Sequence, residues 1–143
     1  MSFNVMIVDD SGAMRSVIKK VITLSGFKMS LCMEAGNGRE ALERLQGNWV
    51  DVIISDINMP EMGGLELLQA LSRDALYQNI PVIIVSTEGS SERMKEALDR
   101  GAKGFIKKPF LPEDIRSVLH KVIGVGTDGE YQDDSGNADQ GDF

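Results

Sequence analysis

Residues 50–56, Val-Asp-Val-Ile-Ile-Ser-Asp, decide the fold class of this chain. The core of this stretch, Val52 to Ile54, is apolar without alternation, which is the pattern of a parallel strand covered on both faces. A second run of the same kind, Pro81–Val85, follows after a segment with helical periodicity. The two predicted strands, Val50–Ser55 and Pro81–Val85, therefore indicate a parallel sheet that lies between layers of helices.

The alternation of β-branched apolar runs with helical segments extends over most of the 143 residues. We predict five strands and five helices within residues 1–123, which is the pattern of a single α/β domain with a doubly wound parallel sheet. The other three strands are Phe3–Val8, Lys28–Glu34 and Gly104–Lys107. The first predicted helix has apolar positions from Met14 to Ile22 and ends at Gly26. The other four helices are Arg39–Gln46, Gly64–Ser72, Ser91–Arg100, which Gly101 ends, and Pro112–Ile123.

The net charge of −7 is concentrated at the end of the chain, because residues 124–143 carry six of the 22 acidic residues and none of the 15 basic ones. This segment is rich in Gly, Asp and Ser, so it cannot bury enough apolar surface to offset its ordering entropy. We predict a disordered acidic tail over residues 124–143. The body is nearly neutral and has no basic stripe, which argues against nucleic acid as a direct partner.

Composition also limits the compartment and the chemistry. The sequence has no apolar stretch of about 18 residues and no signal-like start, so we expect a cytoplasmic protein without a membrane segment. The single cysteine, Cys32, excludes an internal disulfide and a cysteine-based metal site. We expect Cys32 to be a small core residue.

Polar residues stand at the carboxyl ends of four predicted strands: Asp9 and Asp10, Asp56, Ser86 and Lys108. Ligands of open parallel sheets bind at these ends, so we expect the five side chains to lie close together. Carboxylates are the ligands that magnesium takes, and they also attack phosphorus. A hydroxyl and a lysine suit the oxygens of a transferred phosphoryl group. The set favours a Mg²⁺-dependent phosphoryl site with Asp56 as the nucleophile.

Each of these residues has a structural interpretation when it is taken alone. The pair Asp9-Asp10 could cap the next helix, and Asp56 could belong to a turn with Asn58. Ser86 could be a loop or cap residue, and Lys108 a solvated surface lysine. Their combination at one end of the same sheet, in chain order, favours the phosphoryl site.

The residues around these positions form longer motifs: Val8-Asp9-Asp10-Ser11, the run Ser-Asp-Ile-Asn-Met-Pro-Glu-Met-Gly-Gly at residues 55–64, Val85-Ser86, and Lys107-Lys108-Pro109-Phe110. Together they closely resemble the receiver domains of two-component signalling, specifically the single-domain CheY-like response regulators. The resemblance covers residues 3–123 and implies a flavodoxin-like (βα)5 fold with strand order 2-1-3-4-5.

The resemblance implies that Asp56 accepts a phosphoryl group from a sensor histidine kinase of the CheA type. Magnesium would be held by Asp10, Asp56 and the backbone carbonyl of Asn58, while Asp9 would act mainly through water. Lys108 would bind a phosphoryl oxygen.

The resemblance also assigns a switch. Ser86 would turn toward the phosphate, which would let Phe105 move inward and reshape the surface of the last two helices and the strand between them. Asn58, Thr87 and Glu88 would tune dephosphorylation, with the bulk of Thr87 narrowing access to the acyl phosphate. Gly63, where many relatives carry Asp, is expected to loosen the loop after Pro60.

For the output we expect a monomer whose phosphorylated form binds a target such as the flagellar motor switch, with a phosphatase as a further partner. The alternative is a phosphorelay intermediate that passes phosphate to a histidine phosphotransfer protein. A phosphatase of the haloacid dehalogenase type would need Asp-x-Asp after the first strand, where this chain has Asp9-Asp10. A flavodoxin-like electron carrier would need a phosphate-cradling loop after the first strand, where this chain again has Asp9-Asp10. We therefore expect no enzyme activity beyond its own phosphoryl transfer and slow autodephosphorylation.

Overall fold

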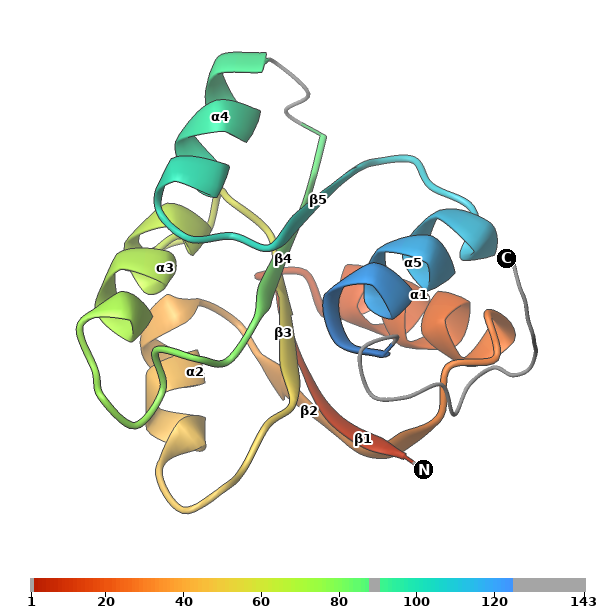
Figure 1. Ribbon diagram of the computed structural model, residues 1–143, viewed down its shortest axis with the longest axis horizontal. Helices are drawn as coiled ribbons and strands as arrows, with labels where there is room; N and C mark the ends of the chain where they lie inside the picture. Colours follow the sequence, from red (N-terminus) through yellow and green to blue (C-terminus); the bar gives the residue numbers. More distant parts are fainter. Residues whose placement is uncertain (1, 88–90, 125–143) are drawn as a thin grey trace.

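The computed structural model describes residues 2–87 and 91–124 (Figure 1). Within these ranges five parallel strands pair in the order β2-β1-β3-β4-β5. Their bounds are β1 Phe3–Val8, β2 Met29–Ala35, β3 Val52–Ser55, β4 Val82–Ser86 and β5 Gly104–Lys107. The predicted fold class and strand order are confirmed. Glu88 and residues 125–143, most of the predicted acidic tail, lie outside the described residues.

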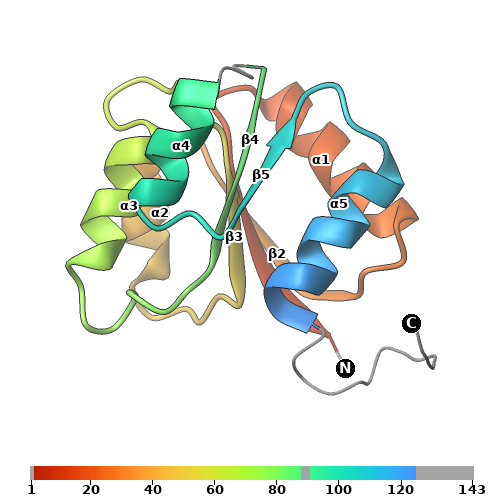
Figure 2. The ribbon, with the colours of Figure 1, turned by 45° about the horizontal axis from the view of Figure 1, so that its top comes forward.

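Helices cover both faces of the sheet: α1 Gly12–Leu24, α2 Gly38–Leu45, α3 Gly64–Ser72, α4 Ser91–Asp99 and α5 Pro112–Leu119. Figure 2 shows α1 and α5 on one face and α2, α3 and α4 on the other. Neighbouring strand residues contribute to opposite layers, so Ile53 joins the core under α2 to α4, while Ile54 joins the core under α1 and α5. All residues of β3 and β4 are buried, as their continuous apolar runs predicted.

The ends of the helices follow the predicted signals. Ser11 is the N-cap of α1, and its side chain accepts a hydrogen bond of 3.1 Å from the backbone N–H of Met14. Gly26 and Gly101 follow α1 and α4 with φ of +90° and +110°, a left-handed conformation that favours glycine, so both predicted stops are confirmed. None of the helices in the described part of the chain is long and apolar enough to cross a membrane.

Some bounds differ from the prediction. β4 includes Ser86, which we had placed just after the strand, and β3 starts two residues later than predicted. The last helix was predicted to run to Ile123, but α5 ends at Leu119 and a π-helix, η1, follows over His120–Gly124. Apolar spacing does not distinguish these two helix types over a single turn, which explains the difference.

Two apolar side chains are more exposed than their sequence pattern indicated. Val17 belongs to the predicted apolar stripe of α1 but is 49% exposed, whereas Ile18 and Ile22 of the same stripe are buried. Cys32 is only partly buried and contacts the rim of the core, because β2 is an edge strand of the sheet. Our expectation that Cys32 is a core residue is therefore only partly right.

Candidate functional site

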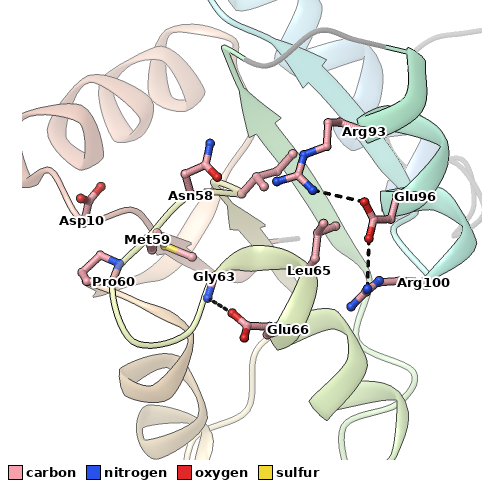
Figure 3. A pocket seen from close by; sticks show the side chains of 11 residues that line it. Asp10, Asn58, Met59, Pro60, Gly63, Leu65, Glu66, Arg93, Glu96 and Arg100 are labelled. Atoms are coloured by element: carbon pink, nitrogen blue, oxygen red, sulfur yellow. Dashed lines mark hydrogen bonds and ion pairs between the residues drawn. The ribbon is translucent and has the colours of Figure 1, made fainter.

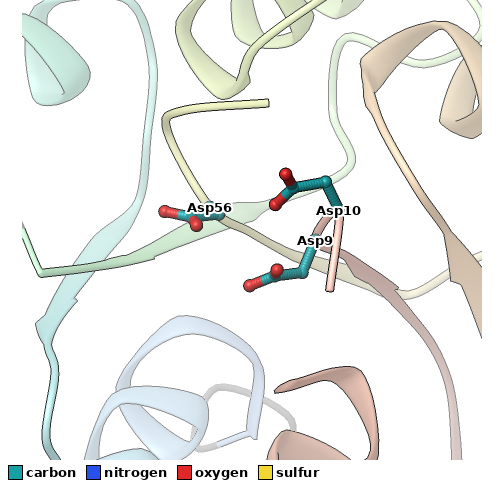
Figure 4. Close-up of side chains that lie close together, drawn as sticks. All are labelled: Asp9, Asp10 and Asp56. Carbon is teal, nitrogen blue, oxygen red and sulfur yellow. The ribbon is translucent and has the colours of Figure 1, made fainter. Parts of the chain in front are cut away.

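The carboxyl ends of β1 and β3 bring three aspartates together. Asp9 and Asp10 follow β1, Asp56 follows β3, and the two strands are neighbours that pair Val8 with Ser55. One oxygen atom from each carboxylate lies within 4.8 Å of the others. Figure 4 shows the three side chains directed into the same region. The predicted carboxylate cluster is therefore present in the fold.

The two adjacent aspartates have different surroundings. Asp9 is 2% exposed, and both of its carboxylate oxygens are engaged: Oδ1 accepts from the N–H of Ser11 at 2.9 Å, and Oδ2 from Nζ of Lys108 at 3.3 Å. Asp10 is exposed, and within residues 2–87 and 91–124 its carboxylate makes no hydrogen bond or ion pair. The Asp10 oxygens are thus open to a ligand, while those of Asp9 are already bound.

Lys108 links the last strand to the carboxylates. Its side chain is 11% exposed, and Nζ lies 3.5 Å from Oδ2 of Asp56 in addition to its contact with Asp9. The backbone N–H of Lys108 donates to the carbonyl of Ser86 at 2.9 Å, which holds the Lys108 backbone at the carboxyl end of β4. A single ammonium therefore bridges the aspartates of β1 and β3.

Asp56 carries the electrostatic cost of this arrangement. Burial raises the pKa of Asp56, and the hydrogen bond from the Ile57 N–H to Oδ1 at 2.7 Å, together with the charge of Lys108, opposes the rise. The negative charge of Asp9 raises the pKa of Asp56 further. With three carboxylates and one lysine, the cluster holds excess negative charge that a bound cation would offset.

The composition of this cluster fits magnesium. Hard carboxylate oxygens are the ligands that Mg²⁺ prefers, and it usually takes one or two of them and keeps several waters. Asp10 and Asn58 line the same hollow of about 600 Å³, so the chain beyond Asp56 also reaches the open side of the cluster (Figure 3). The residues present therefore suit the expected ion.

The loop from Asp56 to α3 is tighter than we predicted. A Cβ atom at Gly63 would lie 2.5 Å from the carbonyl oxygen of Ile57, and one at Gly64 would lie 2.2 Å from that of Asp56. The N–H of Gly64 donates to the Ile57 carbonyl at 2.9 Å. Gly63 therefore allows a close backbone approach, and the expectation that it loosens the loop is wrong.

The predicted switch residues lie at the carboxyl end of β4 and within β5. Ser86 is 1% exposed and is the last residue of β4, where it pairs with Lys107 of β5. Phe105 is partly buried against the core under α2 to α4, and Thr87 is exposed. The positions agree with the prediction, while the movement of Ser86 and Phe105 stays a prediction.

The hollow beside the cluster also reaches α4, and the sequence did not predict this hollow. Glu96 accepts from Arg93 at 3.2 Å and from Arg100 at 3.0 Å, so two arginines share one carboxylate along the rim (Figure 3). Leu65 and Glu66 of α3 line the opposite side. At Asp10, the carboxylate cluster therefore opens into a groove between α3 and α4.

Sequence reasoning also missed Arg15 and Glu34. Nη1 of Arg15 donates to the carbonyl oxygen of Asp9 at 2.6 Å, and Nε pairs with Oε1 of Glu34 at 2.8 Å. A signal was available, since Glu34 ends the second predicted strand, which the strand order places beside the first strand, and Asp9 directly follows that strand. Spacing along the chain alone could not show that Arg15 reaches both.

Comparison with known proteins gives consistent results. Residues 5–120 match the family model of the response regulator receiver domain. The chain is 41% identical to a chemotaxis protein CheY homolog of Campylobacter jejuni over 123 residues, 85% of this chain and 93% of that protein. Chemotaxis response regulator CheY4 of Vibrio cholerae superposes with a TM-score of 0.75 at 36% identity, covering 86% of this chain and all of that one.

A third similar structure is the CheX–CheY–BeF3–Mg²⁺ complex from Borrelia burgdorferi, with 31% identity, a TM-score of 0.74, and 84% of this chain and 88% of that one covered. The family model spans most of the described residues, and the alignment with the Campylobacter jejuni relative covers nearly the full length of that protein. The chain belongs to the receiver-domain family of response regulators and is a CheY-like member of it.

Proposed function

We propose that this protein is a phosphorylation-activated switch in chemotaxis signalling. Asp56 accepts a phosphoryl group from a sensor histidine kinase in a magnesium-dependent reaction, and the phosphorylated form binds a downstream target. The observation that carries the proposal is the convergence of the three carboxylates with Lys108, whose ammonium reaches both Asp56 and Asp9. The similarity to chemotaxis proteins supports the pathway.

For the cation we propose Asp10, Asp56 and the backbone carbonyl of Asn58 as ligands, with Asp9 acting through water. The exposed, unengaged carboxylate of Asp10 supports its role as a direct ligand, and the engaged oxygens of Asp9 support an indirect one. When bound, Mg²⁺ would offset the negative charge of the carboxylates and of the phosphoryl oxygens.

The chemical step then needs few groups from the protein. A carboxylate oxygen of Asp56 attacks phosphorus, the bond from phosphorus to the donor imidazole breaks, and that imidazole, already protonated on its other ring nitrogen, leaves as a neutral group. The Ile57 N–H holds Oδ1 of Asp56 and so fixes the orientation of the nucleophile. Lys108 lies close enough to donate to a phosphoryl oxygen, and Asp9 holds it there.

Switching follows from the added charge. Phosphorylation puts roughly two negative charges where the Asp56 carboxylate carried one. Moving a two-state equilibrium from 99:1 to 1:99 takes about 5.5 kcal/mol of differential stabilisation. Two or three hydrogen bonds to the charged phosphoryl group, each worth about 1.5–3 kcal/mol, supply much of this. We assign one of them to the Ser86 hydroxyl, with Phe105 moving inward behind it.

The output is binding to another protein. The partners we propose are a CheA-like kinase, a target such as the flagellar motor switch, and a phosphatase that shortens the signal, all in the cytoplasm. The CheX–CheY complex of Borrelia burgdorferi supports, by similarity, binding to another protein. Asn58, Thr87 and Glu88 would set the rate of slow autodephosphorylation, and we propose no activity on other substrates.

The proposal is tested by labelling the purified protein with acetyl phosphate in the presence of Mg²⁺. The wild type should take up phosphate, chelation of the cation should stop the uptake, and Asp56→Asn should abolish it. Asp99→Asn, a change of the same kind at an exposed aspartate of α4, is the matched control and should label normally. Unchanged labelling of Asp56→Asn would contradict the assignment.

The switch itself is tested by target capture. Beryllofluoride-activated wild-type protein should retain the motor-switch protein in a pull-down, and Asp56→Asn treated in the same way should not. Equal retention by both proteins would show that binding does not depend on the phosphoryl site.

A further inference from the structure

Arg15 connects three elements at the edge of the carboxylate cluster. It lies in the first turns of α1, its side chain is 22% exposed, and its guanidinium donates to the carbonyl oxygen of Asp9 and to the carboxylate of Glu34. Glu34 is part of β2 and pairs with Ile7 of β1. Because the Asp9 carbonyl belongs to the peptide that joins Asp9 to Asp10, Arg15 holds the backbone unit directly before Asp10.

Asp10 depends on its backbone for its position. Its side chain is exposed and has no hydrogen bond or ion pair to the rest of the described residues. The connection from β1 to α1 consists of Asp9, Asp10 and Ser11. Asp9 and Ser11 are both anchored. The Ser11 N–H donates to the Asp9 carboxylate, and the Ser11 carbonyl accepts from the backbone N–H of Arg15 at 3.0 Å. The bond from the Arg15 side chain completes this frame.

The charge of Arg15 does not explain a role for this residue at the carboxylate cluster. Its guanidinium is already paired with Glu34, in contrast to Lys108, whose ammonium faces the cluster carboxylates directly. A positive charge near a cation site weakens cation binding by simple repulsion. If Arg15 acted only through its charge, its removal would therefore leave Mg²⁺ binding unchanged or make it tighter.

We propose that Arg15 is a positioning residue for the divalent cation. It fixes the peptide between Asp9 and Asp10, so that the Asp10 carboxylate meets those of Asp9 and Asp56, and Glu34 orients Arg15 in turn. The planar guanidinium suits this role because it donates to two acceptors in a fixed geometry. This inference rests on the proposed magnesium site.

The test is calorimetric titration of Mg²⁺ into the full chain, with the unfolding free energy measured in EDTA for every variant. Arg15→Ala should weaken Mg²⁺ binding about tenfold, the lower range for loss of a group that orients a metal ligand. Arg15→Lys keeps the charge but lacks the planar fork, so it should lie between the wild type and Arg15→Ala.

A control variant separates geometry from charge. Lys20→Ala removes a positive charge from an exposed position of the same helix, and it should leave Mg²⁺ affinity at the wild-type value.

The outcomes distinguish this inference from the proposed function. If the wild type does not bind Mg²⁺, the metal site itself is refuted and the inference with it. If the wild type binds Mg²⁺ but Arg15→Ala binds as tightly or more tightly, only the role of Arg15 is refuted, even where its unfolding free energy in EDTA falls. Should Arg15→Ala fail to fold, wild-type affinity in Arg15→Lys refutes the role instead.

Discussion

Replacing Lys108 with methionine should destabilise the protein when divalent cations are absent. Methionine keeps the length and the apolar stem of the side chain, so the substitution removes mainly the charge. The lost ammonium belongs to a side chain that is 11% exposed, and it lies 3.3 Å from Asp9 and 3.5 Å from Asp56. Its removal leaves the three carboxylates facing one another without a counter-charge from this lysine.

The size of the effect follows from the geometry. Each of the two contacts corresponds to roughly 5 kcal/mol of Coulomb attraction at an effective dielectric constant of about 20, but desolvation of the ions offsets much of it. Removing one partner of a buried ion pair costs about 3–5 kcal/mol. Asp10 is exposed and Asp56 is only partly buried, so we expect the lower end, about 3 kcal/mol.

Magnesium should reduce this loss. The variant lacks the competing ammonium and should bind Mg²⁺ more tightly, and each tenfold gain in affinity returns about 1.4 kcal/mol at saturating cation. The gap to the wild type should therefore fall to about half of its value in EDTA.

The measurement is urea unfolding followed by circular dichroism, in EDTA and in excess Mg²⁺. Lys107→Met changes the same charge at the neighbouring, exposed position and should alter stability by no more than about 0.5 kcal/mol. A loss below about 1 kcal/mol for Lys108→Met in EDTA, or a gap that Mg²⁺ does not change, would refute this view of the cluster.

Two further predictions concern the loop after Asp56 and the end of α5. Gly64→Ala should cost about 2–3 kcal/mol in urea unfolding, because its Cβ would meet the Asp56 carbonyl at 2.2 Å; stability equal to that of the wild type would contradict the tight turn. Burial, aided by the charge of Arg116, lowers the pKa of His120 below its ordinary value of 6.5. The unfolded chain therefore takes up a proton that the folded state resists, so stability should fall as the pH drops through the ordinary pKa of 6.5 toward the lowered pKa of the folded state. In His120→Gln this contribution is absent, and a parallel pH profile in the two proteins would refute it.

Local patterns predicted those parts of the fold that depend on local physics. The continuous apolar runs of β3 and β4 indicated strands buried on both faces, and the positions of Asp9, Asp56 and Lys108 at strand ends placed them at one edge of a parallel sheet. The strand order itself came from the family resemblance, because nothing in a strand's own pattern names its neighbour.

The features that escaped prediction depend on long-range contacts. Cys32 has the pattern of a core residue, but its exposure follows from the place of β2 at the edge of the sheet. Gly63 suggested a loose loop, whereas the approach of the Ile57 carbonyl makes it a tight one. Arg15 has the appearance of an ordinary helix residue until β2 brings Glu34 beside it.

The central claim, that Asp56 is the phosphoryl acceptor, is tested most directly by locating the modified residue. The protein is phosphorylated with acetyl phosphate and Mg²⁺ and then treated with borohydride, which reduces an aspartyl phosphate to homoserine, and its peptides are mapped by mass spectrometry. We predict homoserine at position 56, with Asp9 and Asp10 unmodified. Homoserine at position 9 or 10, or phosphate uptake that leaves Asp56 intact, would contradict the claim.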